Sequence, residues 1–83
     1  MKVTVRYFAS LREALGSSES LEVADGMTLG ALRDRLIARS EAHARVLARG
    51  RAVRCALNQA MSDESAAVTE GAEVAFFPPV TGG

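Results

Sequence analysis

The fold depends most on the stretch Thr28-Leu29-Gly30-Ala31-Leu32-Arg33-Asp34-Arg35-Leu36-Ile37, which predicts one amphipathic helix. Its three leucines recur at the spacing that places side chains on one face of a helix, with Ile37 beside them. Thr28 is a suitable N-cap, because its hydroxyl oxygen can accept a backbone hydrogen bond from the first turn. The charged residues expected elsewhere on the cylinder are Arg33, Asp34, Arg35 and Arg39. We expect this helix to end near Ser40.

Strand patterns lie on both sides of this helix. Side chains alternate between apolar and polar in residues 2–8, 21–23, 53–57 and 73–77, as in half-buried strands. Two shorter helical pieces are predicted, one at 10–15 with Ser10 as its cap and one at 41–49 with Val46 and Leu47 inward, before Gly50. Residues 17–20 and 58–71 read as loop or irregular structure. The economical solution is an α+β fold, a mixed four- to five-stranded sheet packed on one main helix.

Length and charge restrict the possible functions. A chain of 83 residues allows one domain, which we place at residues 1–77, followed by a tail at 78–83. Ten basic and ten acidic residues balance, which disfavours nucleic acid as the main partner. The charge is unevenly distributed, however, with +5 in residues 33–54 and −4 in residues 58–83. The arginines either coat solvent faces of helices or form a docking face for an acidic partner or an anionic substrate.

Several residues suggest chemistry that the pattern around them does not favour. Cys55 is a lone cysteine at an inward strand position, typical of a small core residue. His43 has no second ligand or base nearby and is expected on an exposed helix face. Asp63 and Glu64 are adjacent, so their side chains should diverge rather than form an acid–base pair. No spacing supports a metal site. With no signal peptide or apolar span in view, we expect a cytoplasmic protein without a membrane partner.

Two phenylalanines lie on the face of the sheet opposite the core. If Val3, Val5 and Tyr7 face the helix, Phe8 points away, and the same alternation turns Phe77 away when Phe76 points inward. They are either a contact patch for a partner or isolated surface aromatics, with Phe77 covered by the tail or a loop. If Phe8 and Phe77 belong to neighbouring strands, the interpretation as a contact patch is favoured.

The tail Pro78-Pro79-Val80-Thr81-Gly82-Gly83 combines a stiff start with a thin end. Pro78 cannot donate to a sheet ladder and ends the last strand, and Pro79 holds Pro78 extended. Six residues reach about 20 Å. The two glycines lack Cβ atoms and fit a narrow channel. The tail can therefore carry the terminal carboxylate into the active site of another protein, unless the Gly-Gly end is merely a frayed or truncated terminus.

Three segments resemble the family of molybdopterin synthase small subunits, which are ubiquitin-like β-grasp sulfur carriers. They are the last ten residues, Val74-Ala75-Phe76-Phe77-Pro78-Pro79-Val80-Thr81-Gly82-Gly83; the opening Tyr7-Phe8-Ala9 with Leu11-Arg12-Glu13; and Ala56-Leu57-Asn58-Gln59. The resemblance runs from the first strand to the final glycine, and the C-terminal segment is its most specific part. Residues 40–54 carry no signature of the family.

The resemblance implies a carrier that is not an enzyme on its own and holds no permanent cofactor. An activating enzyme similar to those that charge ubiquitin would adenylate Gly83 with ATP, and a sulfurtransferase would supply sulfur to form a thiocarboxylate. The tail would then enter the large synthase subunit, in a heterotetramer of two small and two large subunits, and give sulfur to cyclic pyranopterin monophosphate. Gly82 would provide clearance, Pro78, Pro79, Val80 and Thr81 would thread the channel, and Phe8 and Phe77 would anchor both partners.

Two other functions remain open. The same fold serves sulfur carriers for thiamin synthesis or tRNA thiolation, although the Pro-Pro segment and the opening motif favour molybdopterin. In the other alternative the chain is a protein modifier or interaction module, in which Gly83 forms amide bonds with lysines.

Overall fold

The computed structural model describes residues 1–79. Its elements follow in the order β1 (Lys2–Tyr7), α1 (Ala9–Leu15), β2 (Ser18–Glu22), α2 (Leu29–Ile37), α3 (Glu41–Leu47), β3 (Arg54–Leu57), β4 (Ala60–Ser62) and β5 (Glu73–Phe77).

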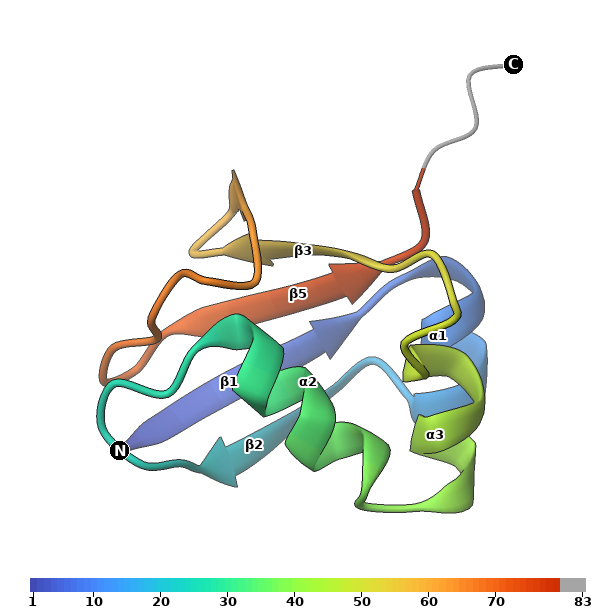
Figure 1. Ribbon diagram of the computed structural model, residues 1–83, viewed down its shortest axis with the longest axis horizontal. Helices are drawn as coiled ribbons and strands as arrows, with labels where there is room; N and C mark the ends of the chain where they lie inside the picture. The colour runs from blue at the N-terminus through green and yellow to red at the C-terminus, as the bar shows by residue number, and fades with distance from the viewer. Residues whose placement is uncertain (80–83) are drawn as a thin grey trace.

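The five strands form one mixed sheet in the order β2-β1-β5-β3-β4. β1 and β5 are parallel at its centre, and the other neighbouring pairs are antiparallel. Because β1 and β5 run in the same direction, both end at the edge of the sheet where α1 and α3 lie (Figure 1). The last strand ends at Phe77, directly before the two prolines, as predicted.

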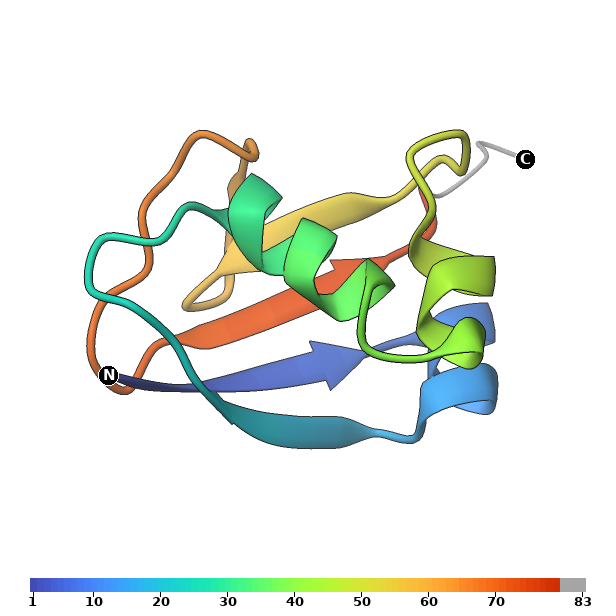
Figure 2. The same ribbon diagram turned by 60° about the horizontal axis from the view of Figure 1, so that its bottom comes forward.

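Helix α2 crosses one face of the sheet, and α1 and α3 pack on each other at one end (Figure 2). The leucines of α2 are buried against β1 and β5, among core residues that include Val5, Tyr7 and Phe76. Thr28 caps α2 as predicted, since its Oγ1 accepts a hydrogen bond from the Ala31 amide at 3.1 Å. The sheet on one main helix therefore agrees with the sequence prediction.

Helix α2 ends at Ile37 rather than near Ser40, and three other local features differ from the prediction. β2 begins at Ser18, so residues 18–20 pair with β1 rather than forming a loop. β4 lies within the segment predicted as irregular, because the turn at Asn58 and Gln59 returns the chain to β3. Helix α1 is capped by Phe8 with no side-chain hydrogen bond, so Ser10 is not its cap. Strand pairing supplies the backbone partners of β2 and β4, and short sequence windows do not contain those partners.

Arg33 is buried, contrary to the prediction that the arginines of this helix lie away from its leucine face. It is 4% exposed, and its guanidinium group donates to the carbonyl oxygens of Leu47, Ala48 and Arg51 at 2.7, 2.8 and 3.2 Å. Its remaining nitrogen lies 2.8 Å from a carboxylate oxygen of Glu64. A buried guanidinium needs such partners because an unsatisfied buried charge is strongly destabilising. Arg33 therefore fastens the loop after α3 to α2.

His43 was predicted to be an exposed helix residue, and this was wrong. Its side chain is 12% exposed, with Nε2 2.8 Å from Glu19 and Nδ1 2.6 Å from the Ser40 hydroxyl. The Tyr7 hydroxyl donates to the same Glu19 carboxylate at 2.7 Å. Burial alone would raise the pKa of Glu19, but hydrogen bonds from His43 and Tyr7 outweigh it and hold that pKa below its ordinary value. The hydrogen-bonded cluster of Tyr7, Glu19 and His43 therefore joins α3 to β1 and β2.

None of the helices formed by residues 1–79 is long and apolar enough to cross a lipid bilayer.

Candidate partner-binding surface

Phe8 and Phe77 lie side by side on the outer face of the sheet, which α2 does not cover. Tyr7 is opposite Phe76 in the parallel pair of β1 and β5, and both are buried. Each is followed by a phenylalanine on the other face, and the Phe8 amide donates to the Phe76 carbonyl oxygen at 3.2 Å. Phe8 is 39% exposed and Phe77 is half-buried. The parity prediction is confirmed, and the neighbouring strands favour a contact patch.

Met61 extends this apolar surface across the sheet. It is opposite Ala56 in β4, and Ala56 is opposite Ala75 in β5, so the three side chains share the outer face. Met61 is 62% exposed, and it and Phe8 are the exposed large apolar residues among residues 1–79. We define the outer patch as Phe8, Ala56, Met61, Ala75 and Phe77. A patch of this composition on so small a protein is typical of a protein interface.

The sequence prediction missed Met61 because the turn before it is unusual. Asn58 and Gln59 both have positive φ, 50° and 71°, as a two-residue hairpin turn requires. Asn58 tolerates this conformation, and its side-chain oxygen accepts from the Glu73 amide at 2.9 Å. This bond ties the turn to the start of β5. The Ala56-Leu57-Asn58-Gln59 motif was the available signal, since it could have been interpreted as a hairpin that continues into a strand.

Arg6 and Glu73 border the patch on its polar side. An Arg6 nitrogen lies 3.0 Å from a Glu73 carboxylate oxygen, and the Arg6 guanidinium lies 5.5 Å from the centroid of the Phe8 ring. A cation over an aromatic face at this distance is weakly attractive. The two contacts place a positive charge beside the Phe8 ring at the border of the patch.

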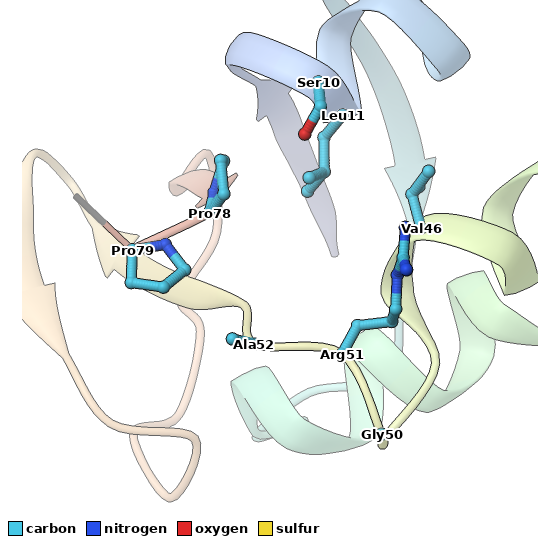
Figure 3. A pocket seen from close by; sticks show the side chains of 8 residues that line it. All are labelled: Ser10, Leu11, Val46, Gly50, Arg51, Ala52, Pro78 and Pro79. Atoms are coloured by element: carbon cyan, nitrogen blue, oxygen red, sulfur yellow. The ribbon is translucent and has the colours of Figure 1, made fainter. Parts of the chain in front are cut away.

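A groove lies beside the first residues of the tail. Its volume is about 420 Å³, and its lining residues come from α1, α3, the loop before β3 and the tail (Figure 3): Ser10, Leu11, Val46, Gly50, Arg51, Ala52, Pro78 and Pro79. Pro78 and Pro79 form one side, and the Arg51 side chain runs along the other toward Val46 (Figure 3). The groove and the outer patch therefore meet at the Phe77–Pro78 junction.

The other predicted site residues of the tail, Val80, Thr81, Gly82 and Gly83, lie outside the described residues. Pro78 and Pro79 are half-buried and follow β5 directly. The tail that carries the predicted reactive carboxylate, on Gly83, therefore starts beside both the outer patch and the groove.

The residues set aside in the sequence analysis do not join this surface. Cys55 is buried, and burial raises the pKa of its thiol, which disfavours the reactive thiolate. Asp63 and Glu64 diverge as predicted, Asp63 accepting from Ser65 and Glu64 pairing with Arg33 and Arg49. Within residues 1–79 no cluster of three His, Cys, Asp or Glu side chains could hold a metal ion.

Comparisons with known proteins agree on one family. The model of the ThiS family matches residues 5–83. The molybdopterin synthase sulfur carrier subunit of Escherichia coli (strain K12) is 41% identical over 81 residues, which cover 98% of this chain and 99% of the relative.

Solved structures share the fold. The crystal structure of Haloferax volcanii small archaeal modifier protein 1 is 27% identical, with a TM-score of 0.76, over 95% of this chain and 98% of that one. A protein–protein complex of subunits 1 and 2 of the molybdopterin-converting factor from Helicobacter pylori contains a chain 26% identical, with a TM-score of 0.71 and full coverage of both chains. The fold is the ubiquitin-like β-grasp.

Proposed function

The chain belongs to the ThiS family, and on that premise we infer that it is the sulfur carrier subunit of molybdopterin synthase. The observation that carries this inference is the position of the start of the tail, at the junction of Phe77 and Pro78. Phe77 is the last residue of β5 and part of the outer patch, and Pro78 follows it as the first residue of the tail. A partner that binds the patch thereby receives the tail at a defined position.

The chemistry we propose takes place at the carbonyl carbon of Gly83. A carboxylate is a poor electrophile, so an activating enzyme first transfers AMP from ATP to it, releasing pyrophosphate. A persulfide held by a sulfurtransferase then attacks the acyl adenylate and displaces AMP. Reduction of the resulting acyl disulfide by a thiol leaves a thiocarboxylate on Gly83. Its sulfur is anionic and polarisable, so it attacks cyclic pyranopterin monophosphate without a neighbouring base.

The folded part of the chain supplies positioning rather than catalysis in this proposal. It is a carrier subunit with no permanent cofactor, and the large synthase subunit supplies the active site. Phe8 and Phe77 anchor that subunit, Pro78, Pro79, Val80 and Thr81 thread its channel, and Gly82 gives clearance at the reacting end. Support for the partner comes from the neighbouring structure of subunits 1 and 2. We place the reaction in the cytoplasm, in a heterotetramer of two small and two large subunits.

Intact mass spectrometry tests this function directly. The full chain is incubated with ATP, the activating enzyme, a sulfurtransferase and a sulfur donor. We expect a gain of about 16 Da, one oxygen replaced by sulfur. Deletion of Gly83, or addition of one residue after it, should abolish the gain with little change in melting temperature. A mass gain that persists after the deletion would place the reacting group elsewhere.

A protein modifier is the second candidate function. The similarity to a small archaeal modifier protein favours it, since that protein has the same fold. The same incubation with added lysine-containing proteins separates the two functions. Adducts linked through lysine, without the thiocarboxylate, would favour the modifier, whereas the thiocarboxylate without adducts favours the sulfur carrier.

A further inference from the structure

The groove beside the tail has a side wall that internal contacts hold firmly. Arg51 and Ala52 line it, and the backbone before them is held by the buried Arg33, which donates to the carbonyls of Ala48 and Arg51. The Arg51 amide also donates to the Ala48 carbonyl at 2.8 Å. Buried charge-assisted hydrogen bonds of this kind define a conformation well. The groove is therefore part of the folded structure.

Two arginines flank the root of the tail. Arg51 lines the groove opposite the prolines (Figure 3), and Arg54 is opposite Phe77 in the β3–β5 pair, on the outer face. Both residues are exposed. Five other arginines form ion pairs with carboxylates: Arg6, Arg33, Arg39, Arg45 and Arg49. Among residues 1–79, neither Arg51 nor Arg54 has a carboxylate partner. The same is true of Arg12 and Arg35, but Arg35 donates to the Glu22 carbonyl oxygen and neither of them lines the groove.

We propose that Arg51, Arg54 and the groove between Arg51 and the prolines form a docking site for an acidic segment of the large synthase subunit. Arg51 and Arg54 would pair with carboxylates, and an apolar side chain beside those carboxylates would enter the groove against Leu11, Val46 and Ala52. This rests on the proposed function, because it is the large subunit that receives the tail. The site is continuous with the outer patch at Phe77, so both surfaces are covered together.

The acidic residues from 58 to 79 are poor candidates for the same role in a second copy. In the stretch from 58 to 79, Glu64 and Glu73 pair with arginines, Asp63 accepts from Ser65, and Glu70 accepts from the Lys2 amide at 3.3 Å. Each carboxylate of that stretch is thus engaged within the chain. Pairing of Arg51 and Arg54 with this stretch of a second copy is therefore disfavoured.

Charge reversal at the two arginines tests the docking site. Binding of the purified large subunit to the full-length chain is measured by surface plasmon resonance for wild type and for Arg51→Glu/Arg54→Glu. We expect the dissociation constant to rise about tenfold or more at low salt, mainly through slower association, because charges at an interface act chiefly on encounter. Wild-type affinity should fall as salt rises from about 50 to about 500 mM, and the variant should respond much less.

The matched control is Arg35→Glu/Arg45→Glu, which changes the net charge equally on α2 and α3 outside the groove lining. It should bind like wild type, and all variants should melt within a few degrees of wild type because the four side chains are exposed. Ala52→Phe, which fills the groove, should weaken binding with wild-type salt dependence. Ala38→Phe, at an exposed position after α2, is its control.

Several results would overturn the docking site. Equal affinity of wild type and the double variant, or equal weakening in the control, would show that Arg51 and Arg54 have no special role. Unchanged binding of Ala52→Phe would remove the groove from the interface. Self-association of wild type that the double variant loses would assign the arginines to a second copy. If wild type itself fails to bind the large subunit, the proposed function fails as well, which distinguishes that case.

Discussion

Phe76 and Phe77 are neighbours in β5 and have the same side chain, but they lie on opposite faces of the sheet. Phe76 is fully buried between the sheet and α2, whereas Phe77 is half-buried beside the exposed Phe8. The arginines divide in the same way. Arg33 is enclosed by carbonyl groups and Glu64, while Arg51 lies at an open groove. In both pairs one member serves the fold, and the other is available to a partner.

This division shows how so small a protein combines stability with binding. A chain of 83 residues has a thin core, so it cannot leave core residues exposed for a partner. Alternation along β5 lets one strand supply both kinds of residue, because successive side chains face either the core or the solvent. The predictions below test whether the two roles are as separate as the structure indicates.

The largest effect is expected from Phe76→Ala. Phe76 is 0% exposed and packs in the main core cluster, so truncation leaves a cavity among well-packed neighbours. Large-to-small changes of this kind cost about 3–5 kcal/mol in free energy of unfolding. Urea denaturation followed by circular dichroism measures this cost. A loss below about 1 kcal/mol would contradict the assignment of Phe76 to the core.

Phe77→Arg should weaken partner binding and leave stability nearly unchanged, unlike Phe76→Ala, which should lower stability. We expect affinity for the large subunit to fall about tenfold to a hundredfold, because an aromatic anchor in a contact patch is replaced by a charge. The melting temperature should change little. Thr4→Arg, exposed on the same face in the middle of β1 and opposite Glu73, is the control and should bind normally. If the Phe77 variant unfolds, the residue belongs to the core, and the comparison between the two phenylalanines fails.

The parts of the fold that local pattern determines could be predicted from the sequence. The leucine spacing predicted α2, and alternation with a following proline predicted β5, its end at Phe77 and the opposite directions of its two phenylalanines. These features need only the geometry of one helix or one strand. The start of the tail at Pro78 was likewise predictable, because proline has no backbone N–H to continue the hydrogen-bond ladder of the sheet.

The parts that depend on distant partners could not be predicted. His43 is held mostly out of solvent beside Glu19, its hydrogen-bond partner, which lies 24 residues away in a segment predicted as a loop. β4 has only three residues and forms because β3 is already in place. Arg33 carried a weak signal, since it lies four residues after Leu29 and so at the edge of the leucine face. Its carbonyl partners come from a loop whose course no local pattern specifies.

Glu64→Gln should give the smallest effect and should change stability without changing binding. Hydrogen bonding from Arg49, and then from Arg33, holds the pKa of Glu64 below its ordinary value of 4.5, although burial opposes this. A lowered pKa in the folded state means that the ionised carboxylate stabilises the fold above that ordinary value. This contribution is lost as the pH falls through the lower folded value.

The free energy of unfolding should therefore decrease more steeply for wild type than for Glu64→Gln as the pH is lowered below about 4.5. At neutral pH the variant should be less stable by about 1 kcal/mol, because the Glu64 side chain is one-third exposed and the amide oxygen of glutamine can still accept from Arg33, which keeps its carbonyl partners. Urea denaturation at a series of pH values measures both quantities. Glu41→Gln is the control, since its contact with Arg45 is 3.9 Å long and highly exposed.

Identical pH profiles for wild type and Glu64→Gln would show that the arginines do not act on this carboxylate. A loss of affinity for the large subunit in Glu64→Gln would show that the buried arginine network also serves binding, because Arg33 positions the wall that carries Arg51.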